Sequence, residues 1–444
     1  MKSAVLASLI GAASLASASP AVEKRQNTKV PHIVVRGNAF FAGNDRFFIR
    51  GIDYQPGGSS ENKDPLADTK VCLRDLEEFK KLGVNTVRVY STDNSKDHKA
   101  CMDAYAAAGI YLLLDINNPN YSINRNNPDP SYNADYLQSV FAYIDEFARY
   151  DNTMAFFSAN EVVHGTANTS LAARHVKATT RDIKSYMAKR GLRQVPVGYS
   201  AADVSENRLQ QAEYFNCGTD DARSDFFAFN DYSWCSSDFK TSGWDKKVET
   251  FKDYGIPIFL SEYGCNENKR DFGEVKALMS PEMTHVYSGG LMYEYTYEAN
   301  KFGIVKINGD KVEELDEFAA LQKALKDNPA PTGLAGAKST QTASKCPAKD
   351  QYWFVDTESL PAFPKDAQKY LDNGAGKGPG LNGVGSQNSG PAKVEEAQPG
   401  SGLGGPANDK NDRTGNSKNA GASTGVSFLM AASALTVSIG ALFL

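Results

Sequence analysis

The sequence predicts an α/β protein, a (β/α)8 TIM barrel followed by a disordered C-terminal stalk. Eight short apolar runs rich in β-branched and aromatic residues alternate with amphipathic stretches between residues 29 and 327. Several of these stretches end at a glycine, such as Gly83 and Gly109, as helices commonly do. Residues 374–425 are rich in Gly, Pro, Ser, Asn and Lys and poor in large apolar residues, so they offer no core of their own.

The order of the predicted elements supports a closed barrel. The predicted strands are Phe47–Gln55, Val84–Tyr90, Ile110–Ile116, Met154–Glu161, Val195–Ser200, Phe226–Ser233, Pro257–Tyr263 and Gly290–Tyr297. The predicted helices are Thr69–Leu82, Asp97–Ala108, Asn133–Tyr150, Ser170–Arg190, Trp244–Tyr254, Phe272–Met279 and Leu315–Lys326. Eight strands alternating with helices over this length are typical of a (β/α)8 barrel. A doubly wound open sheet is the alternative, but it would need a convincing phosphate-binding loop.

Both ends of the chain carry targeting patterns. A basic start, an apolar run and the small residues Ala16-Ser17-Ala18 predict a secretory signal peptide over residues 1–18. The apolar run Val426–Leu444 ends the sequence without a following charge and comes after a polar stretch with small residues. This pattern predicts a signal for a glycosyl-phosphatidylinositol (GPI) anchor, and a tail-anchored membrane helix is the alternative. Candidate attachment residues are Asn419, Asn416 and Gly415.

Secretion determines how the cysteines are interpreted. The six cysteines are even in number, which in an oxidising compartment predicts three disulfides with fifteen possible pairings. The sequons at Asn120 and Asn168 predict N-glycosylation in the same compartment. The net charge of −5 is mild and no strong basic block is present, so nucleic acid is not an expected partner.

The expected organisation therefore has five parts. A signal peptide covers residues 1–18, the (β/α)8 barrel domain covers 27–350, and an extension packed on that domain covers 351–373. The stalk of residues 374–425 and the GPI-signal tail of residues 426–444 complete the chain. We expect a secreted protein that is held on the outer leaflet of the plasma membrane.

Polar side chains gather where the predicted strands end. In a barrel of this kind the carboxyl ends of all strands meet at one rim, and this rim carries the catalytic groups. Glu161 ends the fourth predicted strand and Glu262 ends the seventh. A retaining glycosidase needs two carboxyl groups about 5–5.5 Å apart, one as nucleophile and one as acid/base. The two glutamates are therefore candidates for that pair.

The two carboxyl groups must differ in pKa for this chemistry. We expect Glu161 to be the acid/base, with its pKa raised by the negative charge of Glu262. Asn160 is expected to hydrogen-bond a sugar 2-hydroxyl, and Tyr232 to hold Glu262 as a carboxylate. The alternative is that each glutamate only caps a strand end. The five histidines are too scattered for a metal cluster and no G-x-S-x-G motif is present, so we expect no metal and no cofactor.

The motifs at the strand ends resemble those of glycoside hydrolase family 72, the fungal β-1,3-glucanosyltransferases. The matching pieces span the whole predicted domain in order. They are Gly51-Ile52-Asp53-Tyr54-Gln55-Pro56-Gly57-Gly58-Ser59, Val87-Arg88-Val89-Tyr90, Ser158-Ala159-Asn160-Glu161-Val162, Asp231-Tyr232-Ser233-Trp234-Cys235, Leu260-Ser261-Glu262-Tyr263-Gly264-Cys265 and Tyr293-Glu294-Tyr295.

The resemblance implies a set of roles. Glu161 would be the acid/base and Glu262 the nucleophile. The donor and acceptor subsites would be lined by Gln55, Tyr90, Asp115, Asn160, Tyr232 and one of Tyr293 and Tyr295, of which we favour Tyr295. The implied disulfides are Cys72–Cys101, Cys235–Cys265 and Cys217–Cys346. No cysteine follows Cys346, so the chain resembles the subgroup without a cysteine-rich carbohydrate-binding module.

The resemblance further implies that β-1,3-glucan is both donor and acceptor, with the chain elongating cell-wall glucan by transfer. The residues alone leave the outcome open, because water and a sugar hydroxyl can both resolve a glycosyl-enzyme. An endo-β-1,3-glucan hydrolase is the nearest alternative. A non-catalytic wall-binding protein is the other, although binding alone requires neither glutamate.

Overall fold

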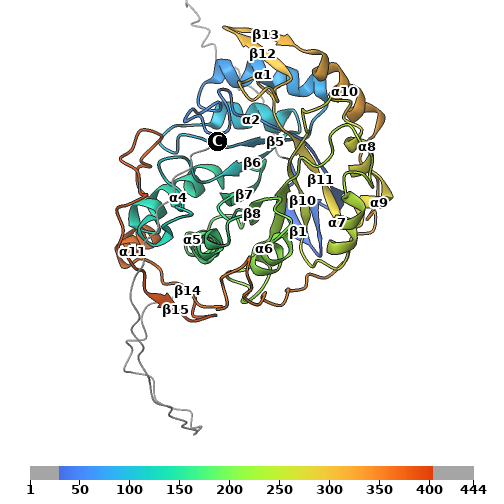
Figure 1. The fold of residues 1–444 in the computed structure, drawn as a ribbon. Helices are drawn as coiled ribbons and strands as arrows, with labels where there is room; N and C mark the ends of the chain where they lie inside the picture. Colours follow the sequence, from blue (N-terminus) through green and yellow to red (C-terminus); the bar gives the residue numbers. More distant parts are fainter. Residues whose placement is uncertain (1–29, 404–444) are drawn as a thin grey trace, which may run out of the picture. The chain divides into compact units, whose positions relative to one another are not determined.

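A closed barrel of eight parallel strands forms the centre of the protein (Figure 1). The computed structural model describes residues 30–403, so the predicted signal peptide, the GPI-signal tail and its attachment candidates lie outside the described residues. The strands follow the barrel in chain order, with β11 closing against β4. This confirms the predicted (β/α)8 barrel. The strands are β4 (Ile49–Asp53), β5 (Thr86–Val89), β6 (Tyr111–Asp115), β7 (Thr153–Asn160), β8 (Val197–Ala202), β9 (Phe226–Asn230), β10 (Ile258–Tyr263) and β11 (Tyr287–Met292).

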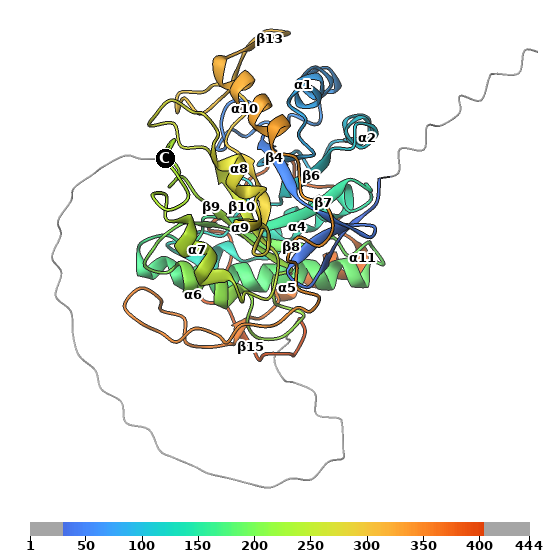
Figure 2. The same cartoon turned by 90° about the vertical axis from the view of Figure 1, so that its right-hand side faces the viewer.

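Helices pack around the outside of the barrel (Figures 1 and 2). They are α1 (Thr69–Leu82), α2 (Lys99–Ala107), α3 (Pro128–Ser131), α4 (Ala134–Phe147), α5 (Ala173–Lys189), α6 (Arg208–Phe215), α7 (Trp244–Phe251), α8 (Glu274–Leu278), α9 (Pro281–Thr284) and α10 (Asp316–Asp327). The sequence did not predict α6. Its buried face includes the polar Gln211, whose side chain donates to Asn207 at 2.7 Å. This polar residue interrupts the helical spacing of apolar residues by which the other helices were predicted. Among the helices of residues 30–403, none combines the length and apolar composition that a membrane span needs.

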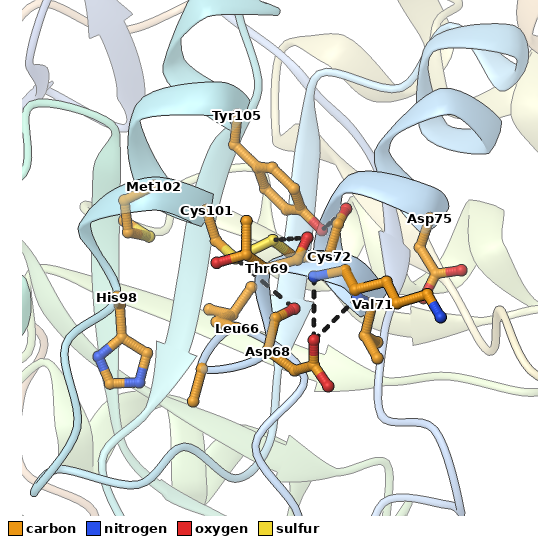
Figure 3. The surroundings of a disulfide bond; sticks show 12 residues. Leu66, Asp68, Thr69, Val71, Cys72, Asp75, His98, Cys101, Met102 and Tyr105 are labelled. Carbon is orange, nitrogen blue, oxygen red and sulfur yellow. Dashed lines mark hydrogen bonds between the residues drawn. A yellow bond between two sulfur atoms is a disulfide. The ribbon is translucent and has the colours of Figure 1, made fainter. Parts of the chain in front are cut away.

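Helix α1 illustrates how local sequence sets the element bounds. The Asp68 side chain accepts hydrogen bonds from the free backbone N–H groups of Lys70 and Val71, which fixes the start of the helix (Figure 3). Gly83 ends it in the left-handed region at φ 74°, where a side chain would be strained. Between these ends the buried face of α1 packs on the barrel, with Cys72 bonded to Cys101 of α2.

A small antiparallel sheet closes one end of the barrel. It consists of β1 (Ile33–Arg36), β2 (Ala39–Ala42) and β3 (Asp45–Phe47), directly before the first barrel strand. Phe40 from β2 lies 5.8 Å from the rings of both Phe226 and Phe259. These aromatic side chains belong to a fully buried cluster inside the barrel. The amino ends of the strands are therefore sealed, and polar chemistry is confined to the carboxyl ends.

Three disulfides are present, with the pairing that the family resemblance implied: Cys72–Cys101, Cys217–Cys346 and Cys235–Cys265. The first joins the neighbouring helices α1 and α2. The third joins the loops that follow β9 and β10, and its cysteines come three residues after Tyr232 and Glu262 in the sequence. The second ties the segment after the barrel to the loop after α6.

The chain continues beyond the barrel along its surface. A hairpin of β12 (Val305–Asn308) and β13 (Lys311–Glu314) precedes α10, and residues 351–373 hold β14 (Leu360–Pro361), the short helix η2 (Lys365–Ala367) and α11 (Gln368–Asn373). Trp353 is fully buried against Tyr214 of α6, with ring centres 5.3 Å apart. The extension thus covers apolar surface on the outside of the helical layer.

The structure corrects the predicted start of the stalk. Residues 374–403 were expected to be disordered, but they pack against the domain, and β15 (Glu396–Ala397) pairs with β14. The segment needs no core of its own because its backbone hydrogen-bonds to side chains of the barrel loops. Leu381 and Ala397 also fill apolar surface of the domain and are buried. The remaining stalk, residues 404–425, lies outside the described residues.

Candidate active site

The two candidate carboxylates lie at the open end of the barrel. Glu161 directly follows β7, and Glu262 is the last residue but one of β10. Asn230, at the end of β9, connects them. It lies opposite Glu262 in the strand register, and its side-chain amide donates a 2.9 Å hydrogen bond to Oε1 of Glu161. The structure thus brings the two predicted carboxylates together through one bridging residue.

Glu262 is held by three donors, two from β5 and the residue after it and one from the loop after β9. Its Oε1 accepts hydrogen bonds from the hydroxyl of Tyr90 at 2.8 Å and from Arg88 at 3.3 Å. Its Oε2 accepts one from the hydroxyl of Tyr232 at 2.5 Å, as predicted. Both carboxylate oxygens are therefore fixed, which aims the group and favours its ionised form.

Burial of Glu262 has the opposite effect on its pKa from these donors. Glu262 is only 7% exposed, and desolvation together with the charge of Glu161 raises its pKa to about 7, although Arg88, Tyr232 and Tyr90 lower it. We expected the raised pKa at Glu161 and expected Glu262 to be the ionised member of the pair. The cost of burying its charge raises the pKa of Glu262, an effect that the sequence prediction did not include.

Glu161 is placed by its backbone. Its φ of 49° lies in the left-handed region, which is unfavourable for a residue with a side chain and often marks a functional position. The conformation is held by two hydrogen bonds. The Glu161 N–H donates to the carbonyl of Ser200 at 2.8 Å, and Arg125 donates to the Glu161 carbonyl at 2.7 Å. The backbone thus turns at the end of β7 and directs the carboxyl group toward Asn230.

A buried polar network supports both glutamates. Arg88 is completely buried on β5 and donates to both oxygens of Asp115, to Glu262 and to Oδ1 of Asn160 at 3.0 Å. The hydroxyl of Ser200 donates to the same Asn160 oxygen at 2.7 Å. Because one oxygen of Asn160 accepts from several donors, its amide group is oriented with the nitrogen free to meet a substrate hydroxyl.

The predicted subsite residues divide into two groups. Tyr90, Asn160, Tyr232 and Tyr293 surround the carboxylates, and the ring of Tyr293 lies 6.3 Å from that of Tyr90 and 6.1 Å from that of Tyr232. Asp115 reaches the same cleft but is only 2% exposed and forms an ion pair with Arg88, so its role is to hold the Arg88 guanidinium group in place.

Two predicted subsite residues lie elsewhere. Tyr295 is fully buried, donates to Asp75 of α1 at 3.0 Å and packs among core aromatics, so our preference for it over Tyr293 was wrong. Gln55 is also fully buried, and its amide bonds the backbone of Glu61, Lys63 and Ser91. Gln55 therefore fixes the loop beside the cleft and does not line it.

Sequence reasoning missed Arg88 and Asn230 as site residues. Arg88 belongs to the recognised motif Val87-Arg88-Val89-Tyr90, and Asn230 directly precedes the recognised motif that begins at Asp231. A buried arginine inside an apolar strand was the available signal, because such a charge needs a carboxylate partner. For Asn230 the signal was its position directly before Asp231-Tyr232 at a strand end.

A cleft of about 570 Å³ opens beside these residues. Tyr90, Asp115 and Asn160 form its inner part. The loop after β6 supplies most of the remaining wall through polar side chains, together with Gln387 from the C-terminal segment. Amides, hydroxyls and one guanidinium group dominate this lining. Such a surface suits a ligand with many hydroxyl groups.

The predicted glycosylation residues differ in their surroundings. Asn168 is exposed in η1 (Ala167–Ala172). Asn120 is half-buried, and its side-chain nitrogen, the atom that would carry a glycan, donates to the carbonyl of Leu381 at 2.9 Å. Glycosylation at both residues stays a prediction.

Only one group of three possible metal ligands occurs within residues 30–403, namely Cys235, Cys265 and Glu267. The two sulfur atoms of this group are joined in a disulfide, so they are not thiolate ligands. The carboxylates of the active site are instead paired with Arg88, tyrosine hydroxyls and Asn230.

Paired strand-end glutamates in a (β/α)8 barrel define an enzyme of the glycosidase type. The model of the glucanosyltransferase family, glycoside hydrolase family 72, matches residues 22–329. The chain belongs to this family, and it is a transglycosylase of the glycoside hydrolase type.

Relatives are similar over most of their length. The chain is 57% identical to 1,3-beta-glucanosyltransferase gel1 of Aspergillus fumigatus, covering 86% of this chain and 84% of that protein. It is 48% identical to 1,3-beta-glucanosyltransferase GAS5 of Saccharomyces cerevisiae, covering 88% and 81%. A solved structure of a Saccharomyces cerevisiae Gas2p variant in complex with laminaritetraose and laminaripentaose superposes with a TM-score of 0.70 at 38% identity, covering 76% of each chain.

Proposed function

We propose that this protein is a 1,3-β-glucanosyltransferase. It cleaves an internal bond of a β-1,3-glucan with retention of configuration and transfers the new reducing end to the non-reducing end of another glucan chain. The observation that carries the proposal is the pair of glutamates joined by Asn230 at the open end of the barrel. The substrate class is supported by the names of the relatives and by the oligosaccharides bound in the Gas2p structure.

The reaction has two displacement steps. In the first, the ionised Glu262 attacks the anomeric carbon, and an ester bond forms as the glycosidic bond breaks. Glu161 gives its proton to the departing glycosidic oxygen, which leaves as the hydroxyl of the released fragment. Tyr90 and Tyr232 hold the attacking carboxylate in position through their hydrogen bonds.

In the second step the ester is resolved by an acceptor. Glu161, now ionised, takes the proton of the acceptor's 3-hydroxyl, whose oxygen attacks the anomeric carbon and releases Glu262 as a carboxylate. Asn160 is proposed to hydrogen-bond the sugar 2-hydroxyl with its free amide nitrogen. Tyr293 lines the same site with its ring and completes the aromatic wall around Glu262.

An endo-β-1,3-glucan hydrolase would use the same residues, with water as acceptor. Transfer prevails only when the cleft holds a sugar hydroxyl near the intermediate at high effective concentration. A reduced laminari-oligosaccharide separates the possibilities. Products longer than the input indicate a transferase, only shorter products a hydrolase, and no change a non-catalytic binder. Glu262→Gln is expected to abolish the longer products, and full activity of this variant would remove the assigned nucleophile.

The acid/base role of Glu161 has its own test. In Glu161→Ala, an activated aryl donor should still form the glycosyl-enzyme because its leaving group needs no proton, and added azide should restore turnover as a β-glycosyl azide. The matched variant Glu213→Ala, which removes a glutamate from α6, should need no azide. A Glu161→Ala enzyme that azide does not accelerate would contradict the assignment.

We further propose that the protein is secreted and held by a GPI lipid on the outer leaflet of the plasma membrane and in the cell wall. The sequence patterns of residues 1–18 and 426–444 support this location. Release of the protein from intact cells by a phosphatidylinositol-specific phospholipase tests the anchor. Substitution of Asn419, Asn416 or Gly415 should identify the attachment residue by loss of that release.

A further inference from the structure

The last part of the described chain lies beside the catalytic cleft. Residues 376–390, named the C-terminal strap here, run along the loop after β6 and α3. The Gly380 N–H donates to Asn94 at 2.8 Å. The carbonyl of Leu381 accepts from Asn62 at 2.6 Å and from Asn120 at 2.9 Å. The strap thus docks through backbone groups that would otherwise face water.

Glycines allow this close approach. A side chain at Gly383 would meet the Tyr121 hydroxyl 2.1 Å from its Cβ, and one at Gly378 would meet Asn94 at 2.5 Å. Farther along, Ser386 is fully buried, and its carbonyl accepts from Asn133 at 2.8 Å. The sequence composition that predicted a stalk therefore serves docking in this stretch.

Docking brings one strap side chain into the cleft. Gln387 lines it together with Asn124, Arg125 and Asn160. The Gln387 side-chain nitrogen donates to the hydroxyl of Ser122 at 2.6 Å, which fixes the amide. Its Oε1 accepts no hydrogen bond from residues 30–403. A fixed amide with a free acceptor at a polar cleft wall loses little conformational entropy when a ligand binds.

We propose that the C-terminal strap forms one wall of the substrate cleft and that Gln387 binds a hydroxyl group of the glucan chain. The inference rests on the proposed function, because it names a further binding residue for the same substrate. Arg125 lies on the same wall, and its bond to the Glu161 carbonyl connects the wall to the acid/base residue. Gln387 accepts from a sugar hydroxyl through Oε1. Neither Glu161 nor Glu262 lines the cleft that Gln387 lines, so the sugar it binds is one away from the scissile bond.

The test compares two glutamine variants of the full-length protein. Gln387→Ala removes the proposed contact, and Gln368→Ala removes a glutamine of α11 whose side chain bonds Asp372 on the surface. The host should attach no N-glycans, because a glycan at Asn120 would occupy the nitrogen that binds the strap. KM and kcat are measured on reduced laminari-oligosaccharides of increasing length. Kd is measured by calorimetry for the same series in the Glu262→Gln background.

One hydrogen bond contributes about 1 kcal/mol, so KM and Kd of Gln387→Ala should rise about fivefold for the longer oligosaccharides. For the shortest oligosaccharides, KM and Kd of Gln387→Ala should stay at wild-type values, and its kcat should not change. Gln368→Ala should have wild-type KM, Kd and kcat at every oligosaccharide length. Wild-type KM and Kd at every length would overturn the inference. An equal loss of affinity for oligosaccharides of every length, together with a lowered melting temperature, would also overturn the inference. Gln387 would then only support the fold. If the wild type forms no products that are longer than the input oligosaccharide, the proposed function fails. The Kd series still decides the inference in that case.

Discussion

Asn230 lies opposite Glu262 across β9 and β10 and donates a hydrogen bond to Glu161. One side chain therefore sets the orientation of the acid/base carboxyl relative to the strand that carries the nucleophile. The oxygen of Asn230 accepts from the hydroxyl of Ser261 at 2.8 Å, which leaves its nitrogen as the donor toward Glu161. This arrangement fixes which end of the amide meets the carboxyl group.

Asn230→Ala is expected to lower kcat for transfer. The variant loses a hydrogen bond to a carboxyl group, which contributes about 1.5–3 kcal/mol and corresponds to about 10- to 150-fold in rate. Initial rates on a reduced laminari-oligosaccharide measure the effect. Asn328→Ala, at the end of α10 on the surface, is the control. A kcat equal to that of the wild type would show that Asn230 does not position Glu161.

Tyr232→Phe should move the acidic limb of the kcat/KM profile to higher pH. The Tyr232 hydroxyl stabilises ionised Glu262 and lowers its pKa, so its removal raises that pKa further. Ionised Glu262 is then lost at a higher pH as the pH falls, and Tyr90→Phe should act in the same direction. Tyr370→Phe, which alters a half-buried tyrosine of α11, should leave the profile in place. A shift of the limb to lower pH in the two site variants would contradict the proposed role of the hydroxyls.

His98 should make stability depend on pH. It is buried between Asp64 at 2.7 Å and Glu146 at 3.0 Å. Burial alone would lower its pKa, but the two carboxylates raise it to about 9. Since the folded value exceeds the unfolded one, the stabilisation is complete below about pH 6.5 and disappears as the pH rises through 9.

The free energy of unfolding should therefore fall by about 3 kcal/mol more in the wild type than in His98→Gln between pH 6.5 and 9.5. Denaturant titrations at several pH values measure this difference. His285→Gln, which changes a half-buried histidine whose ring meets only a backbone carbonyl, should follow the wild type. Parallel curves for the wild type and His98→Gln would exclude a charged His98 in the folded protein.

Two disulfides close loops of nearly equal length, so a comparison of their variants distinguishes an effect on stability from an effect on catalysis. Cys72–Cys101 closes a separation of 29 residues and Cys235–Cys265 one of 30, so each should contribute about 3–4 kcal/mol by restricting the unfolded chain. Replacing either pair by serine should lower stability similarly. Only loss of Cys235–Cys265 should also lower kcat at a temperature where both variants are folded, because this bond joins the loops beside Tyr232 and Glu262. Equal kcat losses in the two variants would contradict this.

The sequence predicted the barrel and its carboxylates because both depend on local pattern. The spacing of apolar residues, the glycines that end helices and the residues at strand ends can all be identified in the sequence. The topology of a closed barrel then brings Glu161 and Glu262 to one rim. The choice between Tyr293 and Tyr295 could not be made this way. Both follow the end of β11 at Met292, where the alternation of a strand no longer says which side chain faces the site.

Other errors arose from long-range contacts. Gln55 ends a predicted strand, but it lies two residues beyond β4 and turns into the protein to bond the loop of residues 61–63. The docking of residues 374–403 depends on barrel loops far away in the sequence, so composition alone predicted disorder. The raised pKa of Glu262 depends on burial, which no motif reveals.

The identity of the nucleophile is the central claim and can be measured directly. A 2-deoxy-2-fluoro laminari-oligosaccharyl fluoride should form a long-lived glycosyl-enzyme. Fluorine at C2 slows both displacements, and the good leaving group accelerates only the first, so the intermediate accumulates. Digestion and mass spectrometry should then place the sugar on Glu262, in the peptide containing Leu260-Ser261-Glu262. A sugar attached to Glu161 or to any other residue, or turnover of the reagent to a product of inverted configuration, would contradict the account.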